Sequence, residues 1–242
     1  MKIFQKGKEI LVELNNFYKR FITSILGIFL IIFGFLYLPQ IKINLIILDD
    51  FYIHPLVILC LLFFILEFLF QLKNNLSSRI KIMYIFFIFY FLFFIHIILI
   101  ENNFLDWKKI FFFILFQVFT VDISGYMAGK VLGKNKIKIL KGISPNKTLE
   151  GYFGSILIGF VAGFIYLSII VLENPINFST KLLLIFSVIF CSIFGDLFVS
   201  KVKRSIGVKD FSKVLYGHGG ISDRLDSLLP SFAISFWIFF LV

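Results

Sequence analysis

The residues most able to do chemistry lie between Asp196 and Asp226, at the end of a strongly apolar run. This stretch holds four aspartates, six Lys or Arg residues, a histidine and a Gly-Gly pair. Ionisable groups at membrane depth are costly and tend to mark a functional site. Carboxylates bind divalent cations, and basic side chains bind phosphates. The stretch therefore predicts a membrane enzyme that handles phosphates and a metal ion.

Asp196, Ser200 and Lys203 are spaced i, i+4, i+7, so they share one face if this part of the chain is helical. A carboxylate, a hydroxyl and an ammonium in a row suit a divalent cation beside an anionic phosphate. Lys203 and Arg204 could instead be basic residues that end a span and reach the membrane surface. That interpretation does not explain Asp196, which would be costly there without a partner.

The segment 217–227, GHGGISDRLDS, follows this face. Gly219 and Gly220 would let backbone N–H groups approach a phosphate closely. Asp223 and Asp226 are three residues apart and share a face in a helix. Two hard oxygen donors suit Mg²⁺, which is typically held by one or two carboxylates plus substrate phosphates. His218 could either bind a phosphate or shape the turn.

A third polar region runs from Asp122 to about residue 151. Asp122 lies within an apolar run, and Lys147 and Thr148 offer a point charge and a hydroxyl to a phosphate. Small residues recur every four positions here and in the next apolar run: Gly125, Gly129, Gly133, Gly151, Ser155, Gly159 and Gly163. Such faces allow close packing of membrane helices. Packing explains the small residues, but it does not explain Asp122.

The elements that must position these residues are apolar helices. Sixty per cent of the residues are hydrophobic and 36 of 242 are Phe, more than a soluble domain needs. About 20 apolar residues cross a bilayer as a helix. We therefore predict an all-α, polytopic helical membrane protein with about seven transmembrane helices, the pattern allowing six to nine. The candidate spans are about 21–38, 52–71, 82–100, 110–129, 151–172, 182–200 and 228–242. Within them, Glu67 and His96 are interpreted as interfacial or packing residues.

The distribution of basic residues predicts the topology. With a cytoplasmic N-terminus, 20 of the 24 Lys and Arg residues fall on the inner side, as the positive-inside rule requires. Residues 1–20 form an amphipathic cytoplasmic segment, 21–109 an N-terminal transmembrane region and 110–242 a catalytic transmembrane region with cytoplasmic loops at 130–150 and 201–227. The net charge of +10 is mostly explained by this topology and by attraction to anionic lipids, so nucleic-acid binding is not expected.

The stretch resembles the signature of the CDP-diacylglycerol synthase (phosphatidate cytidylyltransferase) family. The matching residues are Ser200, Lys203, Arg204, Lys209, Asp210, Ser212, Gly217, His218, Gly219, Gly220, Asp223, Arg224 and Asp226. Tyr216 stands where the family usually has Pro, which alters the rigidity of the turn. Upstream, Asp122, Tyr126, Gly129, Ser144, Pro145, Lys147, Thr148, Glu150 and Gly151 also match, with Asn146 as a mild departure. The resemblance covers about residues 120–230.

The resemblance implies that CTP and phosphatidate give CDP-diacylglycerol and pyrophosphate at a bacterial-type inner membrane, with the site facing the cytoplasm. It implies Mg²⁺ as the cofactor, and the number of carboxylates leaves room for a second cation. The implied catalytic residues are Asp196, Lys203, Arg204, Asp223 and Asp226, and the implied metal ligands are Asp122, Asp196, Asp223 and Asp226. The implied substrate-binding residues are Lys147, Thr148, Ser200, Lys209, His218, Gly219, Gly220 and Arg224. The small-residue faces are compatible with a homodimer.

Other functions remain open from the residues themselves. A related membrane lipid kinase that uses CTP or ATP would need a group to accept a hydroxyl proton. An ion-coupled transporter could use Asp122 and Asp196 as ion ligands, but it would often show an internal repeat, and the sequence has no convincing one. A CDP-alcohol phosphotransferase would carry a dense aspartate cluster that this chain lacks.

Overall fold

A computed structural model of the chain describes residues 27, 29, 31–45, 48–74, 80–140, 142–170, 172, 173, 175–212, 220 and 222–241. The backbone is mostly helical, which confirms the predicted class. The helices are α2 (Pro55–Asn74), α3 (Ile80–Asn103), α4 (Trp107–Val131), α5 (Leu149–Ile169), α6 (Phe178–Ile206), α7 (Ser222–Leu225) and α8 (Leu228–Leu241), with a 3₁₀ turn η1 (Lys138–Leu140). The predicted amphipathic segment 1–20 lies outside the described residues.

Three of the described helices, α4, α5 and α6, are long and apolar enough to cross a membrane. Shorter apolar helical stretches occupy Pro55–Leu69, Phe87–Asn103 and Leu228–Leu241. These elements support a helical membrane protein.

A short β-hairpin departs from the all-α expectation. β1 (Ile41–Leu45) and β2 (Leu48–Ile53) pair antiparallel, with Ile41 opposite Ile53. The hairpin occupies an apolar run that is too short to cross a bilayer and is rich in β-branched isoleucine. Residue 52, expected in a span, therefore lies in a strand. The next helix begins at Pro55, where a proline without an N–H is well tolerated.

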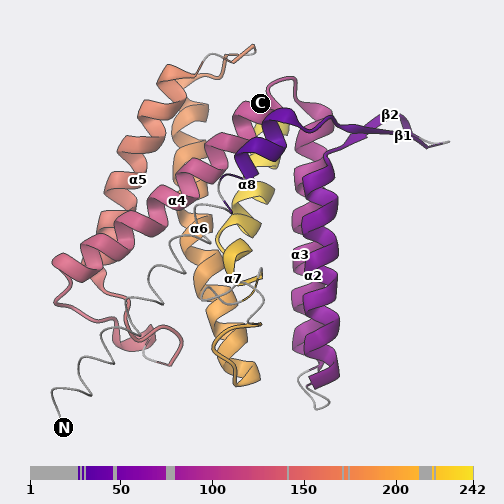
Figure 1. Cartoon of the computed structure of the whole chain (residues 1–242). Coiled ribbons are helices and arrows are strands. Elements are labelled where there is room, and N and C mark those ends of the chain that lie inside the picture. Colours follow the sequence, from indigo (N-terminus) through magenta and orange to yellow (C-terminus); the bar gives the residue numbers. More distant parts are fainter. Residues whose placement is uncertain are drawn as a thin grey trace, which may run out of the picture.

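Polar residues at the end of α3 hold this hairpin. The side chain of Asn102 accepts a hydrogen bond from the Tyr52 N–H and donates one to the Tyr52 carbonyl, both at 2.7 Å. The buried Glu101 carboxylate accepts from the His54 N–H and from the side chain of Gln40, both at 2.9 Å. The hairpin is thus attached to the end of the bundle that α3 reaches at its C-terminus (Figure 1).

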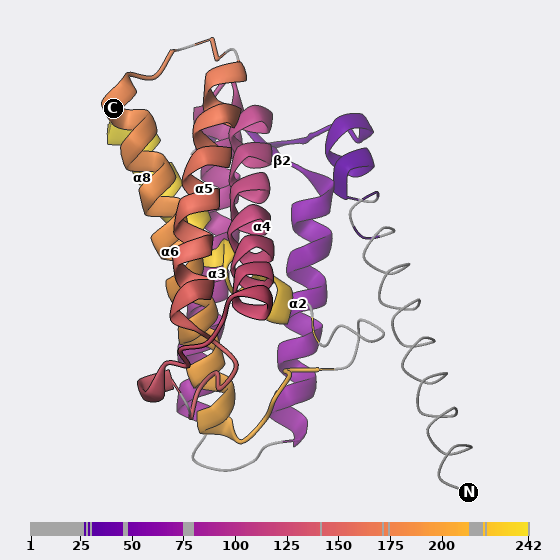
Figure 2. The ribbon, with the colours of Figure 1, turned by 90° about the vertical axis from the view of Figure 1, so that its left-hand side faces the viewer.

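Close packing of α4 on α5 confirms the predicted small-residue face (Figure 2). On α5 the residues with this spacing are buried: Gly151, Ser155, Gly159 and Gly163. A methyl group added at Gly159 would lie 2.9 Å from Val121 Cγ2 of α4. The Gln117 side chain of α4 donates to the Gly159 carbonyl at 3.0 Å. These small residues are used inside one chain, so they give no support to a homodimer.

α6 is 29 residues long and runs past the predicted end of its span at residue 200. It ends at Ile206, and the left-handed φ of 81° at the next residue, Gly207, favours glycine and lets the Gly207 N–H cap the last turn. Asp196, Ser200 and Lys203 therefore lie on one continuous helix, as their spacing required.

α8 lies in the middle of the bundle, in contact with α3, α4 and α6 (Figure 1). The core of the bundle includes fully buried side chains of these four helices: Tyr90, Phe113, Ile114, Leu184, Ile189 and Phe232. Because α8 begins only at Leu228, the turn before it lies against the middle of α6. This turn carries Asp226 into the bundle, beside the polar face of α6.

Candidate active site

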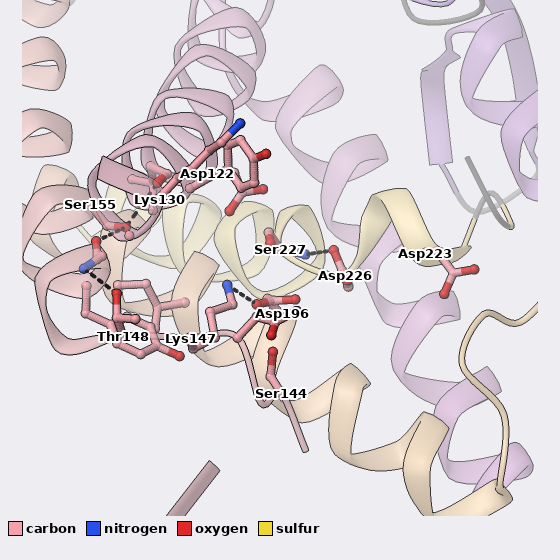
Figure 3. A pocket seen from close by; sticks show the side chains of 18 of the residues that line it. Asp122, Lys130, Ser144, Lys147, Thr148, Ser155, Asp196, Asp223, Asp226 and Ser227 are labelled. Atoms are coloured by element: carbon pink, nitrogen blue, oxygen red, sulfur yellow. Dashed lines mark hydrogen bonds and ion pairs between the residues drawn. The ribbon is translucent and has the colours of Figure 1, made fainter. Parts of the chain in front are cut away.

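A cavity of about 540 Å³ opens between α4, α5, α6 and the α7–α8 turn. Its polar wall brings together residues from all three regions that the sequence singled out: Asp122, Lys130, Ser144, Asn146, Lys147, Thr148, Tyr152, Asp196, Asp223, Arg224, Asp226 and Ser227. Figure 3 shows these side chains converging from separate segments. The volume is in the range of small-molecule binding sites. Basic and acidic groups in one cavity suit a phosphate-bearing ligand with a cation.

Lys147 and Asp196 form an ion pair inside this cavity, with Nζ and Oδ2 2.7 Å apart (Figure 3). Burial lowers the pKa of Lys147, but the Asp196 carboxylate outweighs this effect and the pKa lies above its ordinary value. The Lys147 ammonium also lies 5.8 Å from the centre of the Tyr152 ring. The loop before α5 thus carries a charged lysine to the polar face of α6.

Asp226 and Asp196 both line the cavity, and their side chains lie near each other in Figure 3. Oδ1 of Asp226 accepts the Ser227 N–H at 2.8 Å. Burial, followed by the negative charge of Asp196, raises the pKa of Asp226 to about 7, and Asp122 acts in the same direction. Acidic groups that raise one another's pKa are stabilised by a nearby cation.

These carboxylates suit Mg²⁺ as a partial set of ligands, and substrate phosphates would supply the remaining ligands. Among the described residues, no three acidic, His or Cys side chains form a ready metal-binding group. Mg²⁺, however, is commonly held by one or two carboxylates together with substrate phosphates. Asp196 and Asp226, with Asp122 on the cavity wall, offer hard oxygen ligands of this kind.

Asp223 is engaged by the protein itself. Its Oδ1 pairs with the buried Lys203 ammonium at 2.9 Å, and its Oδ2 accepts the N–H groups of Phe211 at 2.9 Å and Gly220 at 2.8 Å. In Figure 3 its carboxylate lies at the edge of the site, away from Asp196 and Asp226. The geometry is that of an anchor that ties α6 and the following segment to α7. Its role as a metal ligand stays a prediction.

Other predicted site residues have different surroundings. Within the described part of the chain, five of them lie outside the cavity wall: Ser200, Lys203, Arg204, Lys209 and Gly220. Arg204 is exposed and donates to the Val208 carbonyl at 2.9 Å. Thr148 lines the cavity, but its hydroxyl also caps α5 by accepting the Gly151 N–H at 3.1 Å. His218 and Gly219 lie outside the described residues.

Comparison with known proteins identifies the family of the chain. The sequence model of the cytidylyltransferase family matches residues 9–242. The chain belongs to this family.

Individual members of the cytidylyltransferase family match over about half of the chain. A phosphatidate cytidylyltransferase of Mycobacterium bovis is 39% identical over 127 residues, which are 52% of this chain and 40% of that protein. One of Bacillus subtilis is 41% identical over 133 residues, 54% of this chain and 46% of that protein. An uncharacterized Escherichia coli protein, YnbB, is 39% identical over 116 residues, 48% of this chain and 37% of that protein. The matched region thus spans less than half of each relative's length.

Several residues of the cavity wall were not assigned a role from the sequence. Lys130 lies over the Tyr126 ring at 5.8 Å, and both line the cavity. Their spacing from Asp122, four and eight residues along one helix, was a usable signal. Tyr152 carries a buried hydroxyl without a hydrogen-bond partner at the same wall. Tyr152 follows the Lys147–Thr148 segment by only a few residues, and its ring lies 5.8 Å from the Lys147 ammonium.

Gly195 decides how closely Asp226 approaches α6. A methyl group there would overlap the carbonyl oxygen of Asp226 and lie 2.8 Å from Pro230 Cγ. A backbone carbonyl cannot rotate away as a side chain can, so Gly195→Ala should push the α7–α8 turn off α6. We expect a loss of about 1–3 kcal/mol in stability and a fall of about 10²-fold in kcat/KM from the misplaced Asp226.

The matched control is Gly142→Ala, because a methyl group at Gly142 meets nothing within 4 Å. Thermal unfolding in detergent and steady-state kinetics would be measured for both variants. Wild-type kinetics in Gly195→Ala would show that the approach of Asp226 to Asp196 does not matter.

Proposed function

We propose that this chain transfers the cytidylyl group of CTP to phosphatidate, giving CDP-diacylglycerol and pyrophosphate. One observation carries the proposal: a cavity among apolar helices holds three basic side chains, Lys130, Lys147 and Arg224, beside the carboxylates of Asp196 and Asp226. The Mycobacterium bovis and Bacillus subtilis relatives are named phosphatidate cytidylyltransferase, which supports this reaction. So does the family signature that supplies most of these residues.

The reaction needs charge neutralisation more than a strong base. A phosphate oxygen of phosphatidate attacks the α-phosphorus of CTP, and the bond from that phosphorus to the oxygen bridging to the β-phosphate breaks. Pyrophosphate leaves with the electron pair of that bond. The attacking oxygen is already anionic at neutral pH. Lys147, Lys130 and Arg224 line the cavity in which two anions must meet, so positioning and electrostatic stabilisation account for the catalysis.

Asp196 and Asp226, with Asp122, are the residues that would hold Mg²⁺. When bound, the ion neutralises phosphate charge and polarises the phosphoryl oxygens. Asp196 has a second role, since its carboxylate holds Lys147 in the cavity. The ion pair between Asp223 and Lys203 supports the site by fixing α7 to α6.

We further propose about seven spans, a cytoplasmic N-terminus and a site that faces the cytoplasm of a bacterial-type inner membrane. The asymmetry of Lys and Arg supports this topology. Lys147 and Lys203, which lie in or beside the cavity, belong to the segments with many basic residues. CTP is a cytoplasmic metabolite, whereas phosphatidate reaches the cavity from the lipid around α4 to α6.

The test is to incubate the purified protein in detergent or lipid with phosphatidate, Mg²⁺ and CTP labelled in the cytidine. Labelled CDP-diacylglycerol and one pyrophosphate per turnover are expected, and EDTA should abolish both until Mg²⁺ is added back. CTP labelled at the γ-phosphate is run in parallel with diacylglycerol as the acceptor. Label transferred to that lipid would indicate a lipid kinase instead, and a folded protein without either product would refute the proposal.

A further inference from the structure

Glu67 is a buried acid within the apolar helix α2, and it is only 5% exposed. Its Oε2 accepts the N–H of Ser222 at 2.9 Å and the hydroxyl of Ser222 at 2.8 Å. Its Oε1 accepts the hydroxyl of Ser212. One carboxylate of the N-terminal half thus contacts two positions of the signature region, 145 and 155 residues away in sequence.

Two further contacts centre on the same place. The hydroxyl of Tyr90, a fully buried residue of α3, donates to the Ser222 carbonyl. A methyl group added at Gly220 would overlap the Glu67 carboxylate, so only a glycine lets the backbone pass this close. Side chains of α2 and α3 therefore both contact the backbone directly before Asp223, since Glu67 accepts the Ser222 N–H and Tyr90 donates to the Ser222 carbonyl.

A carboxylate inside an apolar helix is costly unless it has partners. Among the described residues, the hydrogen-bond partners of Glu67 are donors from the signature region: two hydroxyls and one N–H. Next to it, Asp223 ties Phe211 and Gly220 to Lys203 of α6. Glu67 therefore fixes the other side of the residues that Asp223 anchors.

We propose that Glu67 is a positioning residue for the signature region: it holds Ser212 and Ser222 together, and through them sets where Asp223 to Asp226 stand against α6. This role rests on the proposed function. Glu67 itself does not line the cavity. Its effect on transfer comes through Asp226, which lies four residues beyond Ser222.

The test compares Glu67→Ala, Glu67→Gln and Glu101→Ala. Glu67→Ala removes every contact and is expected to lower kcat/KM for CTP by about 10²-fold, the usual effect of a misplacement near 1 Å. Glu67→Gln keeps the shape: its amide N–H₂ can donate to the Ser212 hydroxyl while its oxygen accepts from Ser222. It should stay within about tenfold of wild type.

Glu101→Ala is the matched control, because Glu101 is equally buried, at 6% exposed, but holds the hairpin at the other end of α3. Glu101→Ala should lower the thermal stability of the protein, while its kcat/KM for CTP should stay close to that of the wild type. Equal losses of kcat/KM in Glu101→Ala and Glu67→Ala, or a Glu67→Gln variant as poor as Glu67→Ala, would overturn the positioning role.

Deuterium uptake without substrate separates this inference from the proposed function. The Ser222 amide should exchange faster in Glu67→Ala and at the wild-type rate in Glu67→Gln and Glu101→Ala. Unchanged uptake in Glu67→Ala overturns the inference, whatever the reaction is. If wild-type protein transfers no cytidylyl group, the proposed function fails and the role in that reaction fails with it, while the uptake still reports whether Glu67 holds Ser222.

Discussion

Asp196→Asn is expected to reduce cytidylyl transfer by about 10²- to 10³-fold while the protein stays folded. The amide carries no charge, so it weakens the binding of Mg²⁺ and no longer holds the Lys147 ammonium, which lies 2.7 Å away. In the proposed reaction, both groups act at the point where two anionic substrates meet. The Asp196 and Lys147 side chains are 25% and 41% exposed, so the loss of their ion pair should cost little stability.

Steady-state kinetics over a range of Mg²⁺ concentrations would measure this effect. We expect the concentration of Mg²⁺ that gives half-maximal rate to rise in Asp196→Asn, because one carboxylate ligand is lost. Glu173→Gln is the matched control, since it removes an acidic group from an exposed loop at the far end of α5. An Asp196→Asn enzyme with wild-type rate and Mg²⁺ dependence would remove Asp196 from the site.

Asp223→Asn is expected to lower the free energy of unfolding by about 3–5 kcal/mol, the typical cost of removing one partner from a buried ion pair. Within the described part of the chain, Asp223 contacts three donors: the Lys203 ammonium and the N–H groups of Phe211 and Gly220. An asparagine has only one acceptor atom, so its N–H₂ must face at least one of these donors. Transfer should fall as well, because α7 and Asp226 lose their attachment to α6.

Thermal unfolding in detergent would compare this variant with Lys203→Met, with the double variant and with Lys201→Met. In the double variant the asparagine N–H₂ can face the methionine, so its stability should exceed that of Asp223→Asn alone. Lys201 is exposed on the same helix, and its replacement should leave the midpoint unchanged. If Asp223→Asn loses transfer but no stability, Asp223 acts on substrate or metal and is not an anchor.

Local sequence patterns were sufficient to predict some of the helix faces from which the site is built. The spacing of Asp196, Ser200 and Lys203 predicted one helix face, and α6 is continuous through all three. The four-residue repeat of small residues predicted close helix packing, and the structure shows this packing between α4 and α5, where Gly159 is buried. Both features repeat with the period of a helix, so neighbouring residues are sufficient to reveal them. The apolar runs likewise predicted the helical class. The hairpin of β1 and β2 was not predicted, because the apolar run that forms it is short.

The roles of the acidic residues depended on contacts that no local pattern contains. From the sequence, Asp196 and Asp223 were both predicted to be metal ligands. In the fold, Asp196 faces the cavity and Lys147, whereas Asp223 is enclosed by Lys203 and two backbone N–H groups. Whether a carboxylate faces substrate or protein donors depends on which segments pack around it.

The sequence by itself determined the helical membrane class, the family and the set of polar residues from which a phosphate site is built. Each of these follows from composition, from helical period or from a contiguous motif. Only the tertiary structure decided which of those residues share a cavity, and that Glu67 of α2 holds Ser222, 155 positions away. The reason is physical: burial and hydrogen-bond partners are properties of packed surfaces, and packing joins segments that are far apart in the chain.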